Sequence, residues 1–160
     1  MNRTCYKVCL QRERVVQEGY NSSATCLQRS RVVEEEFISA VGNELPTEFV
    51  LKYKIGQKTV PEIGRIFVFD HFEHAKSFMY SLGRRFDACP IRVIFEGLAE
   101  KWGVPKYLVD SYKNIGDMNS FWLDKKQHKR IGRIISRGPP KGSLTCKAFT
   151  PLKEVYRHQY

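Results

Sequence analysis

The chain has 160 residues, 42% of them apolar and 12% aromatic, so it can bury a core without disulfides or metal ions, and its composition excludes a disordered chain. Its formal net charge of +10 is unevenly distributed. Residues 1–100 carry 14 Lys and Arg against 13 Asp and Glu, whereas residues 101–160 carry 13 against four. This excess predicts a surface that faces an anionic partner, although a solvated Lys-rich face would have the same composition.

The cysteines are odd in number and lack a C-x-x-C pair, which argues against a disulfide scaffold. They are Cys5, Cys9, Cys26, Cys89 and Cys146. The sequence has neither the apolar core of a secretory signal nor a stretch that approaches a membrane span. We therefore expect a single domain over residues 1–160 in a reducing cytoplasm, with no membrane partner.

Three strands are predicted in the first half of the chain. Thr4–Leu10 has the β-branched, aromatic and cysteine content of a half-buried strand. The signal weakens between residues 11 and 42, where Ala24–Leu27 is compatible with a strand and Val32–Ile38 with either a strand or a short helix. Phe49–Ile55 alternates apolar residues with two lysines, which is the period of a strand with one wet face. Arg65–Phe69 is short and apolar enough to be a buried strand.

A helix is predicted to begin after Asp70 and to end at Gly83. Asp70 stands three residues before Glu73, the spacing of a capping box. Glycine is the residue favoured just past a helix end. The apolar residues recur at helical spacing, at Phe72, Ala75, Met79 and Leu82.

The rest of the chain predicts further strands and one short helix. Ile91–Glu96, residues 131–136 and residues 143–149 are the expected strands, and Pro105 opens a helix to about Lys113. The order predicts an α+β fold, a mixed or antiparallel sheet with one or two helices packed on it. Residues 101–137 would form a basic helical or loop insertion, and the pairing of the strands on either side of the main helix stays open.

Several segments occur in an order that resembles a loose group of small phage-encoded proteins. They are Tyr6-Lys7-Val8, Tyr53–Gly56, Thr59–Gly64, Ile66–Asp70 with Ala75 and Phe78, and Thr150–Val155. Some members of that group are Thoeris anti-defence proteins, sponges that sequester cyclic ADP-ribose-type nucleotides without cleaving them. The resemblance covers roughly residues 49–96 and 143–156, its motifs are structural, and it carries over no ligand-contacting residue.

This resemblance implies a non-catalytic binding protein in the host cytoplasm, acting as a homo-oligomer with sites between subunits. The sequence has no nucleophile elbow or phosphate-binding glycine loop. His71 and His74 flank Glu73 on the predicted helix, and we expect them to be solvated rather than metal-binding, because further ligands in register are missing. We therefore expect no metal, no cofactor and no enzyme, although an enzyme acting on nucleotides stays open.

The predicted ligand-binding residues form one aromatic and cationic series in the basic third. They are Trp122, Lys125, Lys126, Lys129, Arg130, Arg133 and Arg137. Cations neutralise phosphates and aromatic faces stack bases, so this series predicts a site for a phosphate-bearing signalling nucleotide. The alternative is an accessory protein that binds the phosphates of nucleic acid. A third interpretation places Trp122 in the core and leaves the cations solvated.

Overall fold

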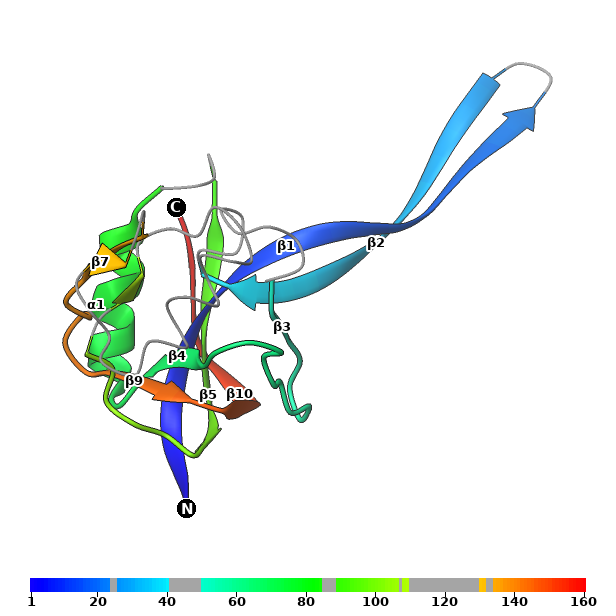
Figure 1. Ribbon diagram of the computed structural model, residues 1–160. Helices are drawn as coiled ribbons and strands as arrows, with labels where there is room; N and C mark the ends of the chain where they lie inside the picture. Colours follow the sequence, from blue (N-terminus) through cyan, green and yellow to red (C-terminus); the bar gives the residue numbers. More distant parts are fainter. Residues whose placement is uncertain (24–25, 41–49, 85–88, 107, 110–129, 132–133) are drawn as a thin grey trace.

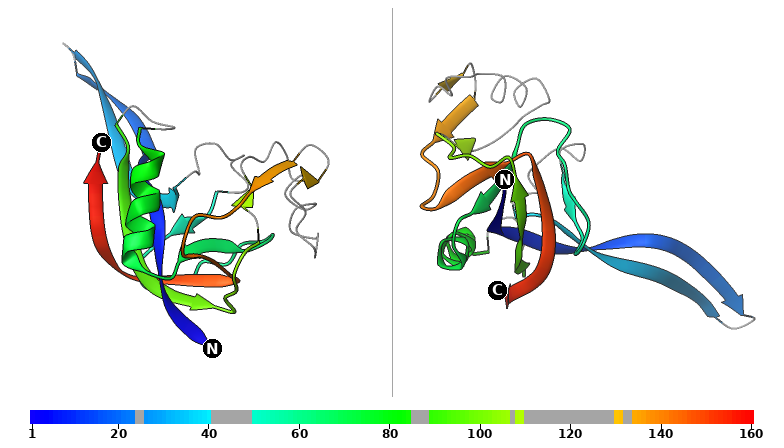
Figure 2. Two further views of the ribbon diagram at one scale, coloured as in Figure 1. Left: turned by 90° about the vertical axis from the view of Figure 1, so that its left-hand side faces the viewer. Right: turned by 90° about the horizontal axis from the view of Figure 1, so that it is seen from below.

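The computed structural model describes residues 1–23, 26–40, 50–84, 89–106, 108–109, 130–131 and 134–160 (Figure 1). In these residues the main sheet has seven strands in the order β10-β5-β1-β2-β3, with β4 beside β1 and β9 beside β4. The strands are β1 (Asn2–Ser23), β2 (Cys26–Ser39), β3 (Lys52–Tyr53), β4 (Ile66–Phe69), β5 (Ile91–Glu100), β9 (Ser143–Cys146) and β10 (Ala148–Gln159). A second sheet consists of β6 (Leu108–Val109), β8 (Ile134–Arg137) and β7 (Arg130–Ile131), of which β7 and β8 are gold in Figure 2.

The expected α+β fold is wrong, because the fold is dominated by antiparallel sheet. The described residues form ten strands and one helix of 11 residues. The largest difference lies in residues 11–39, where the sequence signal was weak and the structure has two long strands. The second predicted helix, from Pro105 to about Lys113, is also wrong in its described part, because Leu108–Val109 forms strand β6.

The helix α1 (Phe72–Leu82) confirms the predicted element, but its N-terminal cap differs from the prediction. The cap residue is His71, which makes no side-chain cap hydrogen bond, so Asp70 lies one residue too early to cap. The predicted end is correct. Gly83 has φ 53°, a conformation that glycine adopts at little cost, and its N–H donates to the Tyr80 carbonyl at 3.1 Å.

Strands β4 and β5 lie on opposite sides of β1 and are both antiparallel to it, so they run parallel to each other. Helix α1 connects them and packs on all three strands. The unit is therefore a strand–helix–strand crossover whose two parallel strands, β4 and β5, are separated by β1. The sequence had left the relative direction of these two strands open.

The core has two layers, one on each face of this sheet. Ala75, Met79 and Leu82 of α1 pack on one face, against Val8 and Ile94. The other face carries an apolar cluster of eleven buried residues from β1, β3, β4, β5, β9 and β10: Cys5, Cys9, Tyr53, Ile66, Val68, Val93, Phe95, Ala99, Leu144, Cys146 and Phe149. The first half of β5 is buried on both faces, from Arg92 to Phe95, whereas burial alternates from Glu96 to Glu100.

The second half of β1 and most of β2 form a two-stranded arm that projects from the body (Figure 1). The antiparallel register runs from Cys9 opposite Ser39 to Ser23 opposite Cys26. At the base of the arm the Glu36 carboxylate binds Arg12 and, at 2.9 Å, the Lys52 ammonium, so one side chain joins β1, β2 and β3. The predicted strand Phe49–Ile55 begins outside the described residues. Within residues 50–55 it is confined to Lys52–Tyr53, with Tyr53 buried and Lys52 exposed as the alternation predicts.

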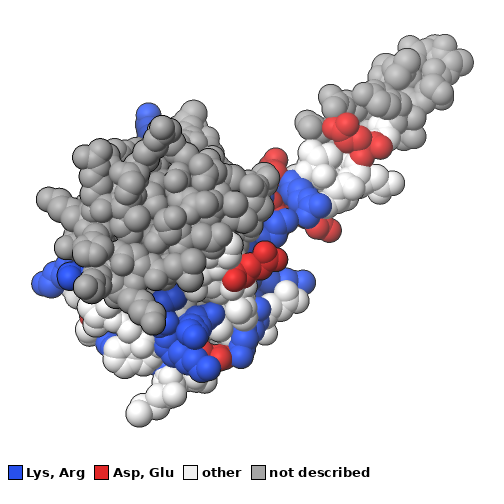
Figure 3. All heavy atoms as spheres, in the orientation of Figure 1, with Lys and Arg blue, Asp and Glu red and all other residues white. Residues whose placement is uncertain are grey.

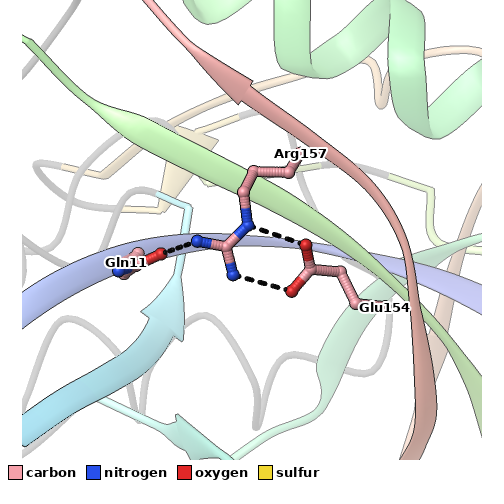
Figure 4. A network of polar contacts seen from close by, with 3 residues as sticks. All are labelled: Gln11, Glu154 and Arg157. Carbon is pink, nitrogen blue, oxygen red and sulfur yellow. Dashed lines mark hydrogen bonds and ion pairs between the residues drawn. The ribbon is translucent and has the colours of Figure 1, made fainter.

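The C-terminal strand is tied to the base of the arm by Arg157 (Figure 4). Its guanidinium donates to both carboxylate oxygens of Glu154, at 2.8 and 2.9 Å, and to the Gln11 amide oxygen at 2.6 Å. Gln11 belongs to β1 and Arg157 to β10, which are separated by β5. The contact therefore joins two strands that share no backbone hydrogen bonds.

Candidate anion-binding surface

The candidate site begins where β5 ends and the charge of the chain becomes basic. Lys101 has φ 49°, the one positive φ found at a non-glycine residue in the described chain. The left-handed conformation costs an L-residue roughly 1–2 kcal/mol. This turn takes the chain out of the sheet and places Trp102, 40% exposed, at its end.

Arg3 and Trp102 form a stacked pair at this end of the sheet. The Arg3 guanidinium carbon lies 4.5 Å from the centroid of the Trp102 ring. Arg3 reaches it because β1 and β5 are neighbours, with Arg3 opposite Ala99 in the register. The pair presents a partly exposed aromatic surface beside a cation, the two groups that bind a nucleobase and its phosphate.

Two other segments bring cations to the same place: the one between β3 and β4, with Lys58 and Arg65, and the turn between β9 and β10, with Lys147. Arg65 donates to the Lys101 carbonyl and, at 3.0 Å, to the Thr145 hydroxyl, and Gly103 pairs with Thr145 through two backbone hydrogen bonds of 2.8 Å. The Lys58 ammonium lies 2.6 Å from the Glu100 carboxylate. We call this surface the basic end, formed by Arg3, Lys58, Arg65, Lys101, Trp102 and Lys147.

The basic end is open to solvent and positively charged. Lys101 and Lys147 are exposed, and the Lys58 side chain is 52% exposed although it pairs with Glu100. The backbone N–H of Lys147 donates to the Glu100 carbonyl at 2.9 Å, which fixes this lysine beside the end of β5. Figure 3 shows Lys and Arg gathered over the lower part of the body, with few Asp and Glu among them.

Most residues of the ligand-binding series predicted from the sequence lie outside the described residues. They are Trp122, Lys125, Lys126, Lys129 and Arg133. The two others lie on the second sheet. Arg130 begins β7, and Arg137 ends β8, where it pairs with Leu108.

Sequence reasoning overlooked Arg3 and Trp102, although one signal was present. Trp102 follows the position at which the charge balance of the chain changes, and an aromatic residue between cations is typical of nucleotide-binding surfaces. Nothing in the sequence connects Arg3 with it. Only the register of β1 on β5 brings these two residues together.

A second feature of the structure is Lys7, which is buried in the core near the thiols of Cys9 and Cys146. Burial lowers the pKa of Lys7, whose ammonium donates to the Phe67 carbonyl at 3.0 Å and lies 5.5 Å from the Tyr53 ring centroid. Burial also raises the pKa of Cys5 to about 11 and those of Cys9 and Cys146 to about 12. These thiols stay protonated at neutral pH, so they are poor nucleophiles and poor metal ligands.

Comparison with protein-family models, with curated proteins and with solved structures gave no match. Within the described ranges, the helical part of the structure contains no segment long and apolar enough to cross a membrane.

Proposed function

We propose that the protein binds single-stranded nucleic acid, with the basic end as the contact surface. The stacked pair of Arg3 and Trp102 carries this proposal. A base can stack on the exposed part of the indole, while Lys58, Lys101 and Lys147 neutralise the neighbouring phosphates. The basic segment 101–137 begins at this surface with Lys101, and its further cations would add to the attraction for phosphates.

The open arrangement supports a polymer over a single small nucleotide. Small ligands are usually enclosed in a concave site that buries most of their surface. The cations of the basic end are instead exposed or half-buried, and they come from β1, from β5 and its following turn, and from the segments before β4 and β10. Such a distributed surface suits a chain of phosphates, which binds by summed counterion release.

The proposal assigns binding and no reaction to the protein. Cys5, Cys9 and Cys146 have raised pKa values because they are buried, so the chemistry at these thiols does not favour nucleophilic catalysis. Sequestration of a small signalling nucleotide, which the resemblance to Thoeris anti-defence proteins implies, remains a prediction that the same experiment tests.

The test is a salt titration of binding to a fluorescent oligothymidine of about 16 nucleotides, followed by anisotropy. One variant carries Lys58→Gln, Lys101→Gln and Lys147→Gln. A control with the same change of charge carries Arg14→Gln, Arg84→Gln and Lys153→Gln, three exposed positions away from the basic end. The first variant should bind more weakly, and its slope of log K against log salt should shrink by roughly 0.7 for each lost phosphate contact, whereas the control should change little.

Two outcomes would redirect the proposal. Tight one-to-one binding of a cyclic ADP-ribose-type nucleotide, with a small salt slope and no competition from oligothymidine, would support the sponge instead. Replacing Lys125, Lys126, Lys129 and Arg130 by Gln tests the series predicted from the sequence. If this variant alone loses oligothymidine binding, the contact surface lies in that series and not at the basic end.

A further inference from the structure

Two histidines and one aspartate meet at the start of helix α1, at the opposite end of β4 from Arg65. The Asp70 carboxylate oxygen Oδ1 lies 2.6 Å from His74 Nδ1 and 3.1 Å from His71 Nδ1. One ligand atom from each of the three residues falls within 4.8 Å of the other two. Among the described residues, this is the one group of His, Cys, Asp or Glu side chains close enough to hold a metal ion.

The missing capping interaction explains how the cluster forms. His71 occupies the N-cap, and Asp70 precedes it. The Asp70 carboxylate therefore does not cap the helix, and it contacts the side chain of His74 in the first helical turn. The backbone of Asp70 is fixed because its N–H donates to the Gly142 carbonyl at 2.9 Å. All three ligands therefore come from one five-residue segment, Asp70–His74. Asp70 supplies the additional ligand that the sequence analysis did not find for the two histidines.

Gly142 closes one side of the cluster. A Cβ atom on this glycine would lie 2.1 Å from His74 Nδ1 and 2.2 Å from Asp70 Oδ1, and its φ of 75° also disfavours any other residue. The backbone thus lies directly against the two inner ligands. The third ligand, His71, has a side chain that is 68% exposed, so the open side of the cluster faces solvent.

We infer that Asp70, His71 and His74 form a binding site for a borderline divalent cation of the zinc, cobalt or nickel class. Imidazole nitrogens favour these ions over magnesium and calcium. With metal–ligand bonds of about 2.0–2.2 Å, neighbouring ligands of a tetrahedral ion lie about 3.3 Å apart. The 3.1 Å between His71 Nδ1 and Asp70 Oδ1 is close to this value, whereas the 2.6 Å between His74 Nδ1 and Asp70 Oδ1 is a hydrogen-bond distance, so these two atoms must separate when an ion binds. Three protein ligands leave the fourth position for water or for an oxygen of a bound molecule.

The site is distinct from the proposed nucleic-acid surface and is tested without nucleic acid. The full chain is stripped with a chelator, and Co²⁺ is titrated in while the visible absorption is recorded. One Co²⁺ per chain should bind and give weak visible bands without the strong near-ultraviolet band of a cobalt–thiolate bond. A competing titration with Zn²⁺ should displace it.

Variants separate a metal site from a set of hydrogen-bonded side chains. His74→Ala and Asp70→Asn should each weaken Co²⁺ binding by roughly 10- to 100-fold or more. His71→Ala should do the same and should fold normally, because its side chain is largely exposed. His158→Ala is the matched control, since this histidine contacts Tyr80 and Tyr160 instead, and it should bind as the parent does.

The inference fails if the folded parent binds no Co²⁺ at a one-to-one ratio. It also fails if a thiolate band appears, which would place the ion on cysteine, or if His71→Ala and His158→Ala bind Co²⁺ equally well. In the first case the two histidines serve only to donate hydrogen bonds to Asp70.

Discussion

The guanidinium of Arg3 stacks on Trp102 at the end of the paired strands β1 and β5, where the basic last third of the chain begins. Arg3 lies in the first strand and Trp102 follows β5, so the contact ties the N-terminus to the end of a buried strand. An exposed cation–π pair contributes only about 0.5–1 kcal/mol to stability. Trp102 is also 40% exposed, so much of its surface remains accessible to a ligand.

Gly97 allows β10 to pack closely on β5. A Cβ at this position would lie 2.3 Å from the Thr150 carbonyl oxygen and 2.7 Å from the Phe149 ring. Gly97→Ala should therefore lower the free energy of unfolding by about 1–3 kcal/mol, because the backbone of β10 must move. Urea titration measures the change. Gly138→Ala, where the added Cβ would meet nothing within 4 Å, should be nearly neutral, and equal effects of the two variants would contradict the packing described for Gly97.

Glu36 makes the base of the arm sensitive to acid. Burial alone would raise the pKa of Glu36, but hydrogen bonds from Lys52 and Arg12 outweigh it and lower the pKa below its usual value. The contribution to stability is therefore fully present above the unfolded pKa of about 4.3 and is lost as the pH falls from that value through the lower pKa of the folded state.

Glu36→Gln should remove about 0.5–1 kcal/mol of stability at pH 7 and little at pH 3, as measured by urea titration at both values. Glu34→Gln, an exposed position on the same strand, serves as the control. A loss for Glu36→Gln that is the same at both pH values would show that charge at this carboxylate does not matter.

Lys7 should cost stability because its ammonium lies in the core. Its pKa is lowered by burial, so the unfolded chain binds more protons than the folded one between the folded pKa and about 10.4. Stability should therefore rise with pH through this range. Lys7→Met should raise the free energy of unfolding at pH 7 by on the order of 1 kcal/mol and abolish that rise. If the variant is less stable than the parent, the hydrogen bond to the Phe67 carbonyl stabilises the fold more than burial of the charge destabilises it.

The buried thiols should resist alkylation. Burial raises the pKa of Cys5 to about 11 and those of Cys9 and Cys146 to about 12, and only the thiolate reacts. Brief treatment of the native protein with iodoacetamide at pH 7.5 should label the exposed Cys89 and leave these three unmodified, as read by peptide mass spectrometry. All should react in denaturant. Labelling of native Cys9 as fast as Cys89 would show that this core opens readily.

The sequence predicted those elements whose side chains repeat with a clear period. The helix was predictable because its apolar residues recur on one face and Gly83 ends it. The arm was not, because a two-stranded ribbon that covers no core needs no apolar alternation, and its valines Val15 and Val33 are 39% and 42% exposed. A pattern of burial therefore cannot reveal strands that bury little.

The candidate sites depend on pairings that local patterns do not contain. Trp102 could have been singled out by its basic neighbours, but Arg3 joins it only through the register of two strands. Asp70 was read as a helix cap because its spacing from Glu73 is that of a capping box, and a shift of one residue in the helix start turned its carboxylate toward two histidines instead.

A base stacked on Trp102 is the central contact of the proposed function, and tryptophan fluorescence measures this contact. The chain has two tryptophans, so Trp122→Phe leaves Trp102 as the single reporter. Addition of oligothymidine should quench its emission in a saturable way, with the same midpoint as the anisotropy titration. Trp102→Ala should weaken binding by about 1–3 kcal/mol, the usual contribution of one stacked base, while its urea midpoint changes little. Binding that saturates in anisotropy without quenching Trp102, and that survives Trp102→Ala unchanged, would contradict the account.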